Sequence, residues 1–165
     1  MRKRYIAGIF LLVSGMISSC VENSNNYIKG IDPYLISYSF KKLDFTTNTS
    51  SVEGFGKSWN IEGKDFYASY NISLYSIDNS NNIQSIQASA TLNDLNGKID
   101  YSFFHEIALQ TKEECDQNIV SNWLSNHYNN AGDTIINQVS FSISQPSELT
   151  KILRISKILS DKEEK

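Results

Sequence analysis

The stretch "FYASYNISLYSIDNSNNIQSIQASATL", residues 66–92, decides the fold, because it predicts two strands that pair through the loop between them. Apolar and polar residues alternate along both halves, which is the pattern of half-buried strands. The apolar positions are Phe66, Ala68, Tyr70, Ile72 and Leu74 in the first half and Ile86, Ala88, Ala90 and Leu92 in the second. A three-residue loop, Asn79 to Asn81, sets Leu74 opposite Ile86, whereas a two-residue loop would place one apolar face in water.

Residues 98–110 continue the alternation and predict a third strand. The odd positions carry the larger apolar side chains: Ile99, Tyr101, Phe103, His105, Ile107 and Leu109. Asn96-Gly97 precedes this segment and is typical of a two-residue hairpin turn, in which both residues need positive φ. With that turn Ala88 lies opposite His105, and residues 66–109 form a three-stranded meander.

Helical spacing begins after this meander. Thr111 and Glu114 fit a capping box, and the residues that follow place one apolar stripe on a helix over about 112–128. The stripe consists of Cys115, Ile119, Val120, Trp123 and Leu124.

Further strands are expected outside the meander and the helix, over 34–40, 134–143 and 149–159, with "SQPS" as the turn between the last two. The Thr-, Ser- and Gly-rich segment 46–64 is expected to be a long loop with a short strand around Trp59. We therefore predict an α+β fold, an antiparallel sheet of about six or seven strands with one helix packed on one face. A β-sandwich carrying one helix is the alternative.

The N-terminus has the pattern of an export signal. Arg2, Lys3 and Arg4 precede about a dozen mostly apolar residues, and "GMISSC" (15–20) follows. This apolar run is shorter than the about 20 residues that a membrane-spanning helix needs. A basic region, a short apolar region and small residues before a cleavage site are typical of a signal peptide.

The residues Ile17-Ser18-Ser19-Cys20 resemble the lipobox of bacterial lipoproteins. The resemblance covers only residues 1–20, and it implies that the chain is cleaved before Cys20, which then carries the lipid as acyl chains. Two or three acyl chains hold a protein firmly on a membrane. Because Val21 rather than an aspartate follows the cysteine, the resemblance also implies the outer membrane of a two-membrane bacterium.

Cleavage before Cys20 divides the chain into four parts. Residues 1–19 are the signal peptide, 20–30 a lipidated tether, 31–159 a single globular domain and 160–165 a charged tail. Of 15 basic and 18 acidic residues, cleavage removes three basic ones, which leaves 12 against 18. An acidic mature chain without a basic patch does not fit a nucleic-acid-binding protein.

The sequence contains no motif of a known catalytic or metal site. His105 and His127 are far apart in the chain, and no Cys, Asp or Glu cluster has metal-ligand spacing. After lipidation of Cys20, Cys115 is the remaining thiol, and its place on an apolar helix face predicts a buried side chain. We therefore expect no cofactor, no metal and no catalytic residue, and a protein that is not an enzyme.

Candidate binding residues lie on the outward face of the predicted meander and in one loop. The expected registers bring Asn71, Ser89 and Phe104 into one row on that face, which also holds Tyr67 and Tyr75. Hydroxyls, amides and aromatic rings in this arrangement could bind a sugar or a partner protein, although an ordinary solvent face or the inner side of a second sheet would show the same pattern.

The loop candidate is Phe55, which lies between two glycines and is an exposed aromatic unless it folds back on the core. These features predict a lipid-anchored envelope protein that acts as a non-catalytic binding or accessory module with a protein or glycan partner. A structural or assembly lipoprotein and an enzyme with an unrecognised site are the alternatives.

Overall fold

The structure is a computed structural model that describes residues 26–41, 45–52, 56–78 and 80–159. In chain order these residues form one helix, four strands, two helices separated by a short 3₁₀ turn, and three strands. The elements are α1 (Pro33–Lys41), β1 (Thr46–Val52), β2 (Gly56–Lys64), β3 (Ala68–Ser76), β4 (Ser85–Leu92), α2 (Tyr101–Ala108), η1 (Leu109–Thr111), α3 (Gln117–His127), β5 (Gly132–Ile136), β6 (Val139–Ser147) and β7 (Thr150–Lys157).

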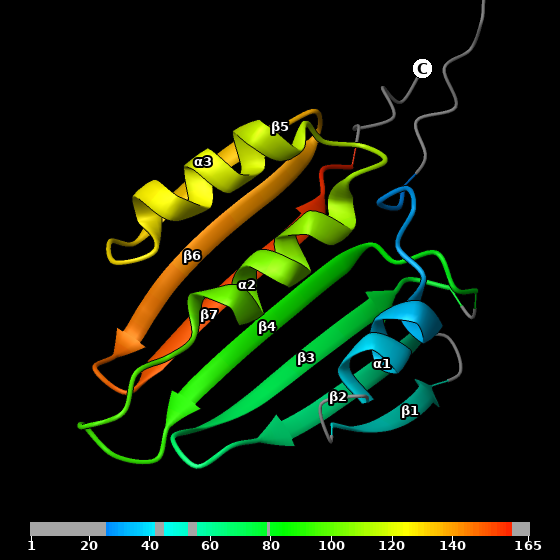
Figure 1. Cartoon of the computed structure of the whole chain (residues 1–165). Coiled ribbons are helices and arrows are strands. Elements are labelled where there is room, and N and C mark those ends of the chain that lie inside the picture. Colours follow the sequence, from blue (N-terminus) through cyan, green and yellow to red (C-terminus); the bar gives the residue numbers. More distant parts are fainter. Residues whose placement is uncertain (1–25, 42–44, 53–55, 79, 160–165) are drawn as a thin grey trace, which may run out of the picture.

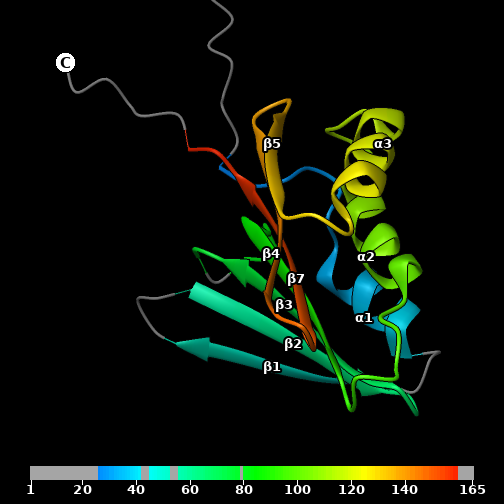
Figure 2. The same cartoon turned by 90° about the vertical axis from the view of Figure 1, so that its left-hand side faces the viewer.

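The strands form a single antiparallel sheet in the order β1-β2-β3-β4-β7-β6-β5 (Figure 1). The three helices lie against one face of this sheet, and the opposite face carries no helix of the described chain (Figure 2). The predicted antiparallel sheet with helical cover on one face is therefore confirmed. The prediction of one helix is wrong, because the described residues contain three, and their strands form one sheet rather than the two of a sandwich.

The β3–β4 hairpin has the predicted register. Leu74 lies opposite Ile86, and Ile72 lies opposite Ala88. Asp78 stabilises the turn, since its carboxylate accepts hydrogen bonds from the hydroxyl groups of Ser76 and Ser80 and from the backbone N–H of Ser80. The alternation of apolar residues thus fixed which faces of the two strands are buried.

The third strand of the predicted meander is wrong, because residues 101–108 form helix α2. Asp100 is the N-cap, and its side chain accepts a hydrogen bond from the backbone N–H of Ser102. Asn96 and Gly97 belong to a turn closed from Gly97 N–H to Asp94 O, and this turn leads into α2 instead of a hairpin. On the side away from β3, β4 pairs with β7, so Ala88 lies opposite Leu153 and not opposite His105.

Helix α3 begins later than predicted, at Gln117, with Asp116 as its N-cap. Thr111 lies in η1, where its hydroxyl group donates to the carbonyl oxygen of Ala108 instead of capping a helix. The predicted helix over 112–128 is therefore confirmed only for its C-terminal two thirds. Val120, Trp123 and Leu124 are buried as the apolar stripe predicted, whereas Ile119 is 54 % exposed.

Of two N-terminal predictions, one is wrong and the other is confirmed in part. Residues 34–40 belong to helix α1, which buries Ile36 and Phe40 one turn apart and leaves Tyr34 and Tyr38 exposed. In the segment 46–64 the predicted strand around Trp59 is confirmed as β2, whereas the predicted long loop is wrong where β1 forms, with Thr49 opposite Trp59.

The C-terminal half of the sheet is a second meander, β5-β6-β7. The predicted strand 134–143 is two strands, joined by a turn in which Asn137 and Gln138 both have positive φ, 48° and 64°. The predicted strand 149–159 is confirmed as β7, whereas the "SQPS" residues lie inside β6, at an irregularity of its pairing.

The core lies between the helices and the covered face of the sheet. Its largest fully buried side chains come from both layers and from the chain before α1: Trp59, Phe104, Phe141, Ile28, Ile36, Ile61, Ile72, Leu74, Ile83, Ile86, Ile107 and Leu124. None of the helices in the described part of the chain is long and apolar enough to cross a bilayer.

Candidate functional site

The uncovered face of the sheet is a mainly polar surface, rich in hydroxyl and amide side chains and with a few charged and apolar ones such as Arg154 and Ile152; we call it the open face. Side chains alternate between the two faces of a strand, so the open face receives every second residue. One row across it, given by the strand registers, consists of Asn48, Asn60, Ser73, Gln87, Arg154, Ser142 and Asp133. Within this row Ser73 donates to Asn60, and Arg154 donates to Gln87.

A groove of about 490 Å³ lies on the open face, over the ends of β1 to β4; we call it the distal groove. Its lining comes from four neighbouring strands: Thr46, Glu62, Gly63, Lys64, Ser69, Tyr70, Asn71, Ser89 and Thr91. This volume lies within the range of about 300–1,000 Å³ that is usual for small-ligand sites. Glu62 and Lys64 are the charged residues of the lining, and their charges are opposite.

Asn71 and Ser89 stand opposite each other in the β3–β4 ladder and form the middle of the groove. The Oδ1 atom of Asn71 accepts a hydrogen bond from the Ser73 hydroxyl group, at 3.0 Å. Within the described residues its amide nitrogen and the hydroxyl groups of Ser69 and Ser89 have no hydrogen-bond partner. These groups can therefore donate to and accept from a bound molecule.

Tyr67 and Tyr75 lie at the two ends of β3 on the open face. Tyr75 is 45 % exposed and lies opposite Ser85. Tyr67 is 57 % exposed, and its carbonyl oxygen accepts the backbone N–H of Asn93, which continues the β3–β4 register past Leu92. Tyr67 lies in the bend directly before β3, two residues before Ser69, and is not among the residues that line the distal groove.

The third member of the predicted row, Phe104, is not on this face. It is fully buried in α2, where its ring packs against Phe103 and Tyr128. The assignment is wrong because it depended on residues 98–110 being a strand. Phe55 lies outside the described residues. The sequence predicted a strand around Trp59 but neither β1 nor the pairing of β1 and β2 with β3, which brings Thr46, Glu62 and Lys64 to the groove.

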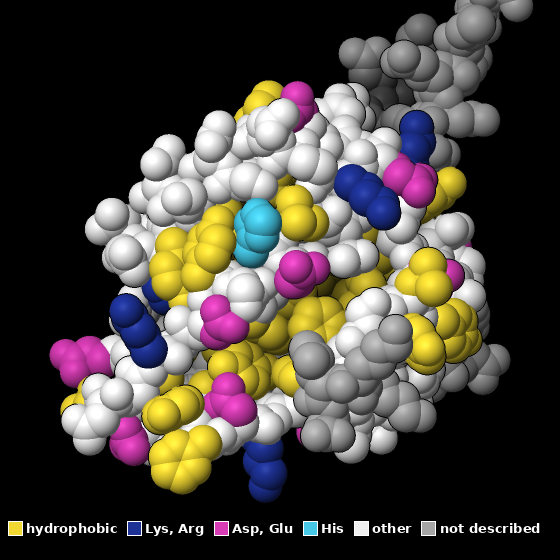
Figure 3. All heavy atoms as spheres, in the orientation of Figure 1, with side chains coloured by type: hydrophobic (Ala, Val, Ile, Leu, Met, Phe, Trp, Pro, Cys, Tyr) yellow, Lys and Arg dark blue, Asp and Glu magenta, His cyan; other side chains and the backbone are white. Residues whose placement is uncertain are grey.

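A smaller cavity, of about 220 Å³, lies on the helix side, between α1, α2 and the β2–β3 turn. Its walls are aromatic and its rim is mostly acidic: Phe40, Phe45, Lys64, Asp65, Tyr70, Asp100, Ser102, Phe103 and Glu106. Acidic side chains border the hydrophobic area beneath α2 in Figure 3. Gly63 has room for no side chain here, because a Cβ would lie 2.4 Å from the Phe45 ring.

Asp65 fixes the β2–β3 turn at this cavity. Burial would raise the pKa of its carboxyl group, but hydrogen bonds from the backbone N–H groups of Ala68 and Tyr67 and from the Tyr70 hydroxyl group outweigh it, so the pKa is lowered. Burial, followed by this hydrogen bond to Asp65, raises the pKa of Tyr70. Tyr70 therefore acts as a hydrogen-bond donor to a carboxylate that is charged at neutral pH.

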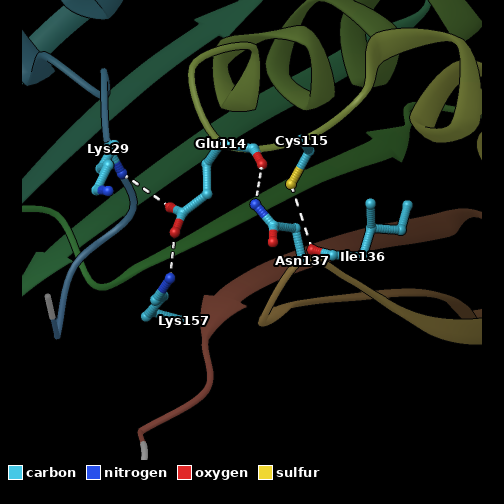
Figure 4. Close-up of polar contacts among 6 residues, drawn as sticks. All are labelled: Lys29, Glu114, Cys115, Ile136, Asn137 and Lys157. Atoms are coloured by element: carbon cyan, nitrogen blue, oxygen red, sulfur yellow. Dashed lines mark hydrogen bonds and ion pairs between the residues drawn. The ribbon is translucent and has the colours of Figure 1, made fainter. Parts of the chain in front are cut away.

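A buried carboxylate ties both ends of the described chain to the helical layer. Glu114 forms an ion pair with Lys157 at the end of β7, and its other carboxylate oxygen accepts the backbone N–H of Lys29, at 2.9 Å (Figure 4). The carbonyl oxygen of Glu114 accepts from the Asn137 side chain in the β5–β6 turn. Four segments that are distant in sequence are thus held together at one corner of the domain.

The N-terminal segment enters the domain at this same corner. Ile28 is buried, and its N–H donates to Ile83 O, while Lys157 N–H donates to the adjacent Gln84 O. The packed region therefore includes Ile28 and Lys29, which the sequence interpretation placed in the tether. From Gln84 to Thr91 the chain runs along β4 for about 23 Å at 3.3 Å per residue, so the distal groove lies at the opposite end of the strands.

The remaining reactive side chains have structural contacts. His105, in α2, shares a hydrogen bond with Ser121 at 3.1 Å, and His127, at the end of α3, contacts the carbonyl oxygen of Trp123 at 2.9 Å. Cys115 is buried and donates its S–H to Ile136 O, and burial raises the pKa of the thiol. The described residues contain no group of three or more His, Cys, Asp or Glu side chains placed to hold a metal ion.

No protein-family model matches the chain, and neither a curated protein nor a solved structure is significantly similar to it.

Proposed function

We propose that this chain is a lipid-anchored bacterial envelope protein whose mature domain binds a ligand in the distal groove and carries out no reaction on it. Lipidation at Cys20 holds the domain on the membrane, and Val21 favours the outer membrane. The ligand is a glycan or a protein rather than a nucleic acid, because the mature chain is acidic.

The observation that carries the proposal is the position of the groove relative to the anchored end. Residues 28 and 29 are hydrogen-bonded at one corner of the domain, only eight residues after Cys20. The distal groove lies at the other end of β3 and β4, on a face that none of the three described helices covers (Figure 2). A domain attached in this way presents the groove away from the membrane surface.

The composition of the groove supports binding over catalysis. General acid–base or nucleophilic chemistry requires titratable groups held close together in a cleft. The groove instead places free hydroxyl and amide groups at its centre, at Ser69, Asn71 and Ser89. Such groups fix the orientation of a ligand through hydrogen bonds. The carboxylate of the lining belongs to Glu62, which lies opposite Asn71 and not opposite a serine, and no lining residue is a histidine that could activate a hydroxyl group.

The anchor is tested by mass spectrometry of the purified protein and its Cys20→Ser variant. The wild type should begin at Cys20 and carry acyl chains, and the variant should not be acylated. Retention of residues 1–19 or an unmodified Cys20 in the wild type would contradict the anchor. Fractionation of the two membranes tests the location, and recovery in the inner membrane alone would contradict the outer-membrane assignment.

The groove is tested by a photoreactive side chain introduced at Ser89 in living cells. Ser140 is the matched control, because it lies on the open face but on β6, outside the groove. We expect one cross-linked envelope component at position 89, absent at position 140 and lost when Asn71→Arg fills the groove. Equal products at both positions, or none at position 89, would contradict the proposed function.

A further inference from the structure

The hydrogen-bonding groups of the distal groove are closely spaced and include both donors and acceptors. Asn71 and Ser89 are direct neighbours across the ladder, and Ser69 follows Asn71 on the same face of β3. Hydroxyl groups both donate and accept, and the free amide nitrogen of Asn71 donates. A ligand that satisfies all of them must carry several donors and acceptors close together, as a polyhydroxylated molecule does.

The charge of the groove favours a neutral ligand. Glu62 and Lys64 contribute one negative and one positive charge, and the other lining residues are uncharged at neutral pH. A phosphate- or carboxylate-rich polymer would need several cationic side chains along its path. Next to the groove, Arg154 is the cation of the central row, and its guanidinium group already donates to Gln87.

The groove also lacks the apolar centre that a protein partner needs. Protein interfaces depend on a buried core of aromatic and aliphatic side chains surrounded by a polar rim. None of the residues that line the groove is aliphatic, and its centre is formed by Asn71 and Ser89. A protein bound here would bury polar groups without gaining apolar contact area.

Tyr67 supplies an exposed aromatic ring, which the hydroxyl and amide groups of the groove do not provide. Tyr67 is 57 % exposed in the bend before β3, two residues before Ser69, and its ring contacts the Phe66 ring edge-on, with 5.2 Å between the ring centroids. An aromatic ring with a polar hydroxyl group suits a partner with one apolar and one polar side. A sugar ring is such a partner, because its C–H face is apolar and its hydroxyl groups project from the edge.

We infer that the distal groove binds a neutral oligosaccharide or polysaccharide chain, with one sugar ring stacked on Tyr67 and the next units hydrogen-bonded to Ser69, Asn71 and Ser89. This inference rests on the proposed function and names the ligand class for the same groove.

The test is binding of the purified lipidated protein, in detergent, to an array that carries neutral and acidic bacterial glycans. We expect binding to neutral glycans, and isothermal titration with the strongest of them should be unaffected by added NaCl, since salt screens only charged partners. Asn71→Ala and Ser89→Ala together should weaken binding about tenfold or more, because two hydrogen bonds are lost. Tyr67→Ala should weaken it as well, and Tyr67→Trp should retain it and change tryptophan emission when the glycan is added.

Ser140→Ala is the control substitution, since it removes a hydroxyl group from the open face outside the groove and should leave the affinity unchanged. Binding to acidic glycans alone, or binding that NaCl abolishes, would overturn the inference. Absence of all glycan binding, together with a protein cross-linked at Ser89 and not at Ser140, would overturn the glycan ligand while leaving the proposed binding function in place.

Discussion

Glu114 and Lys157 form an ion pair in which both side chains are only 6 % exposed. The same carboxylate accepts the backbone N–H of Lys29, so the pair also holds the segment that enters the domain from the N-terminal side. A buried charge is tolerated only when its partners stay in place. This corner therefore combines a stability requirement with the point where the N-terminal segment joins the domain.

Glu114→Ala should lower the free energy of unfolding by about 3–5 kcal/mol, because it leaves the buried ammonium group of Lys157 without a counter-charge. Urea unfolding followed by circular dichroism measures the loss. Glu106→Ala, which removes an exposed acid from α2, is the control and should change stability by less than about 0.5 kcal/mol. Equal effects of the two substitutions would show that the ion pair contributes nothing.

Trp123→Ala should lower the free energy of unfolding by about 3–5 kcal/mol, the usual cost of removing a large core side chain. Trp123 is 8 % exposed and its ring lies 5.8 Å from that of Phe141, between α3 and the sheet. The same urea titration tests this. A loss below about 1 kcal/mol would mean that the indole contributes little to the contact between the helices and the sheet.

The parts of the fold that the sequence predicts correctly are those where alternation and loop length agree. In residues 66–92 the strand pattern persists for several residues on each side of a polar loop, and a shift of the register by one residue would turn one apolar face to water. The register is as predicted although the connection is longer than three residues, since β3 ends at Ser76 and β4 begins at Ser85. In residues 101–108 the alternation is misleading, because Phe103, Phe104, Ile107 and Ala108 also form one face of a helix. Asp100 was the signal that could have decided between them, since it is a favoured N-cap residue.

The same ambiguity between a strand and a helix face explains why residues 34–40 predict a strand although they form α1. Alternating aromatic and aliphatic residues over 34–40 predict a strand, yet Pro33 after Asp32 is a helix start signal, and the Asp32 carboxylate accepts the N–H of Tyr34.

The groove could be predicted from the sequence only in part. The Asn71–Ser89 pair follows from the hairpin register. The part of the groove that β1 supplies could not be predicted, because β1 consists of Thr, Asn and Ser with a single Val at its end and has no apolar alternation.

Gln138→Gly should raise the free energy of unfolding by up to about 1 kcal/mol. Gln138 has a φ of 64°, a conformation that costs about 1–2 kcal/mol for residues other than glycine, and part of that gain is lost to the flexibility of glycine when unfolded. Asn137→Gly is the matched control at the neighbouring positive φ. It should not stabilise, because it removes the hydrogen bond from the Asn137 side chain to Glu114 O.

Cys115 should be inert toward thiol reagents in the folded protein. Its side chain is 4 % exposed, and burial raises the pKa of the thiol, so that the reactive thiolate is scarce at neutral pH. Titration of the Cys20→Ser variant with a chromogenic disulfide should show no reaction under native conditions and one thiol in denaturant. Rapid labelling of the native protein would place the thiol at the surface.

Asp65 should contribute stability that is lost in acid. Its pKa in the folded state is lowered below the ordinary value of 3.8, because the hydrogen bonds from Ala68, Tyr67 and Tyr70 outweigh the effect of burial. The folded state therefore binds this proton less readily than the unfolded state, so the stabilisation is complete above pH 3.8 and disappears as the pH falls through the lowered pKa. Urea unfolding of the wild type and of Asp65→Asn should show a difference in the free energy of unfolding between them. This difference should be constant at higher pH and shrink below pH 3.8. Tyr70→Phe removes one of the three donors to Asp65 and should lose part of the same pH-dependent stability. A difference in unfolding free energy between wild type and Asp65→Asn that does not depend on pH would contradict the assignment.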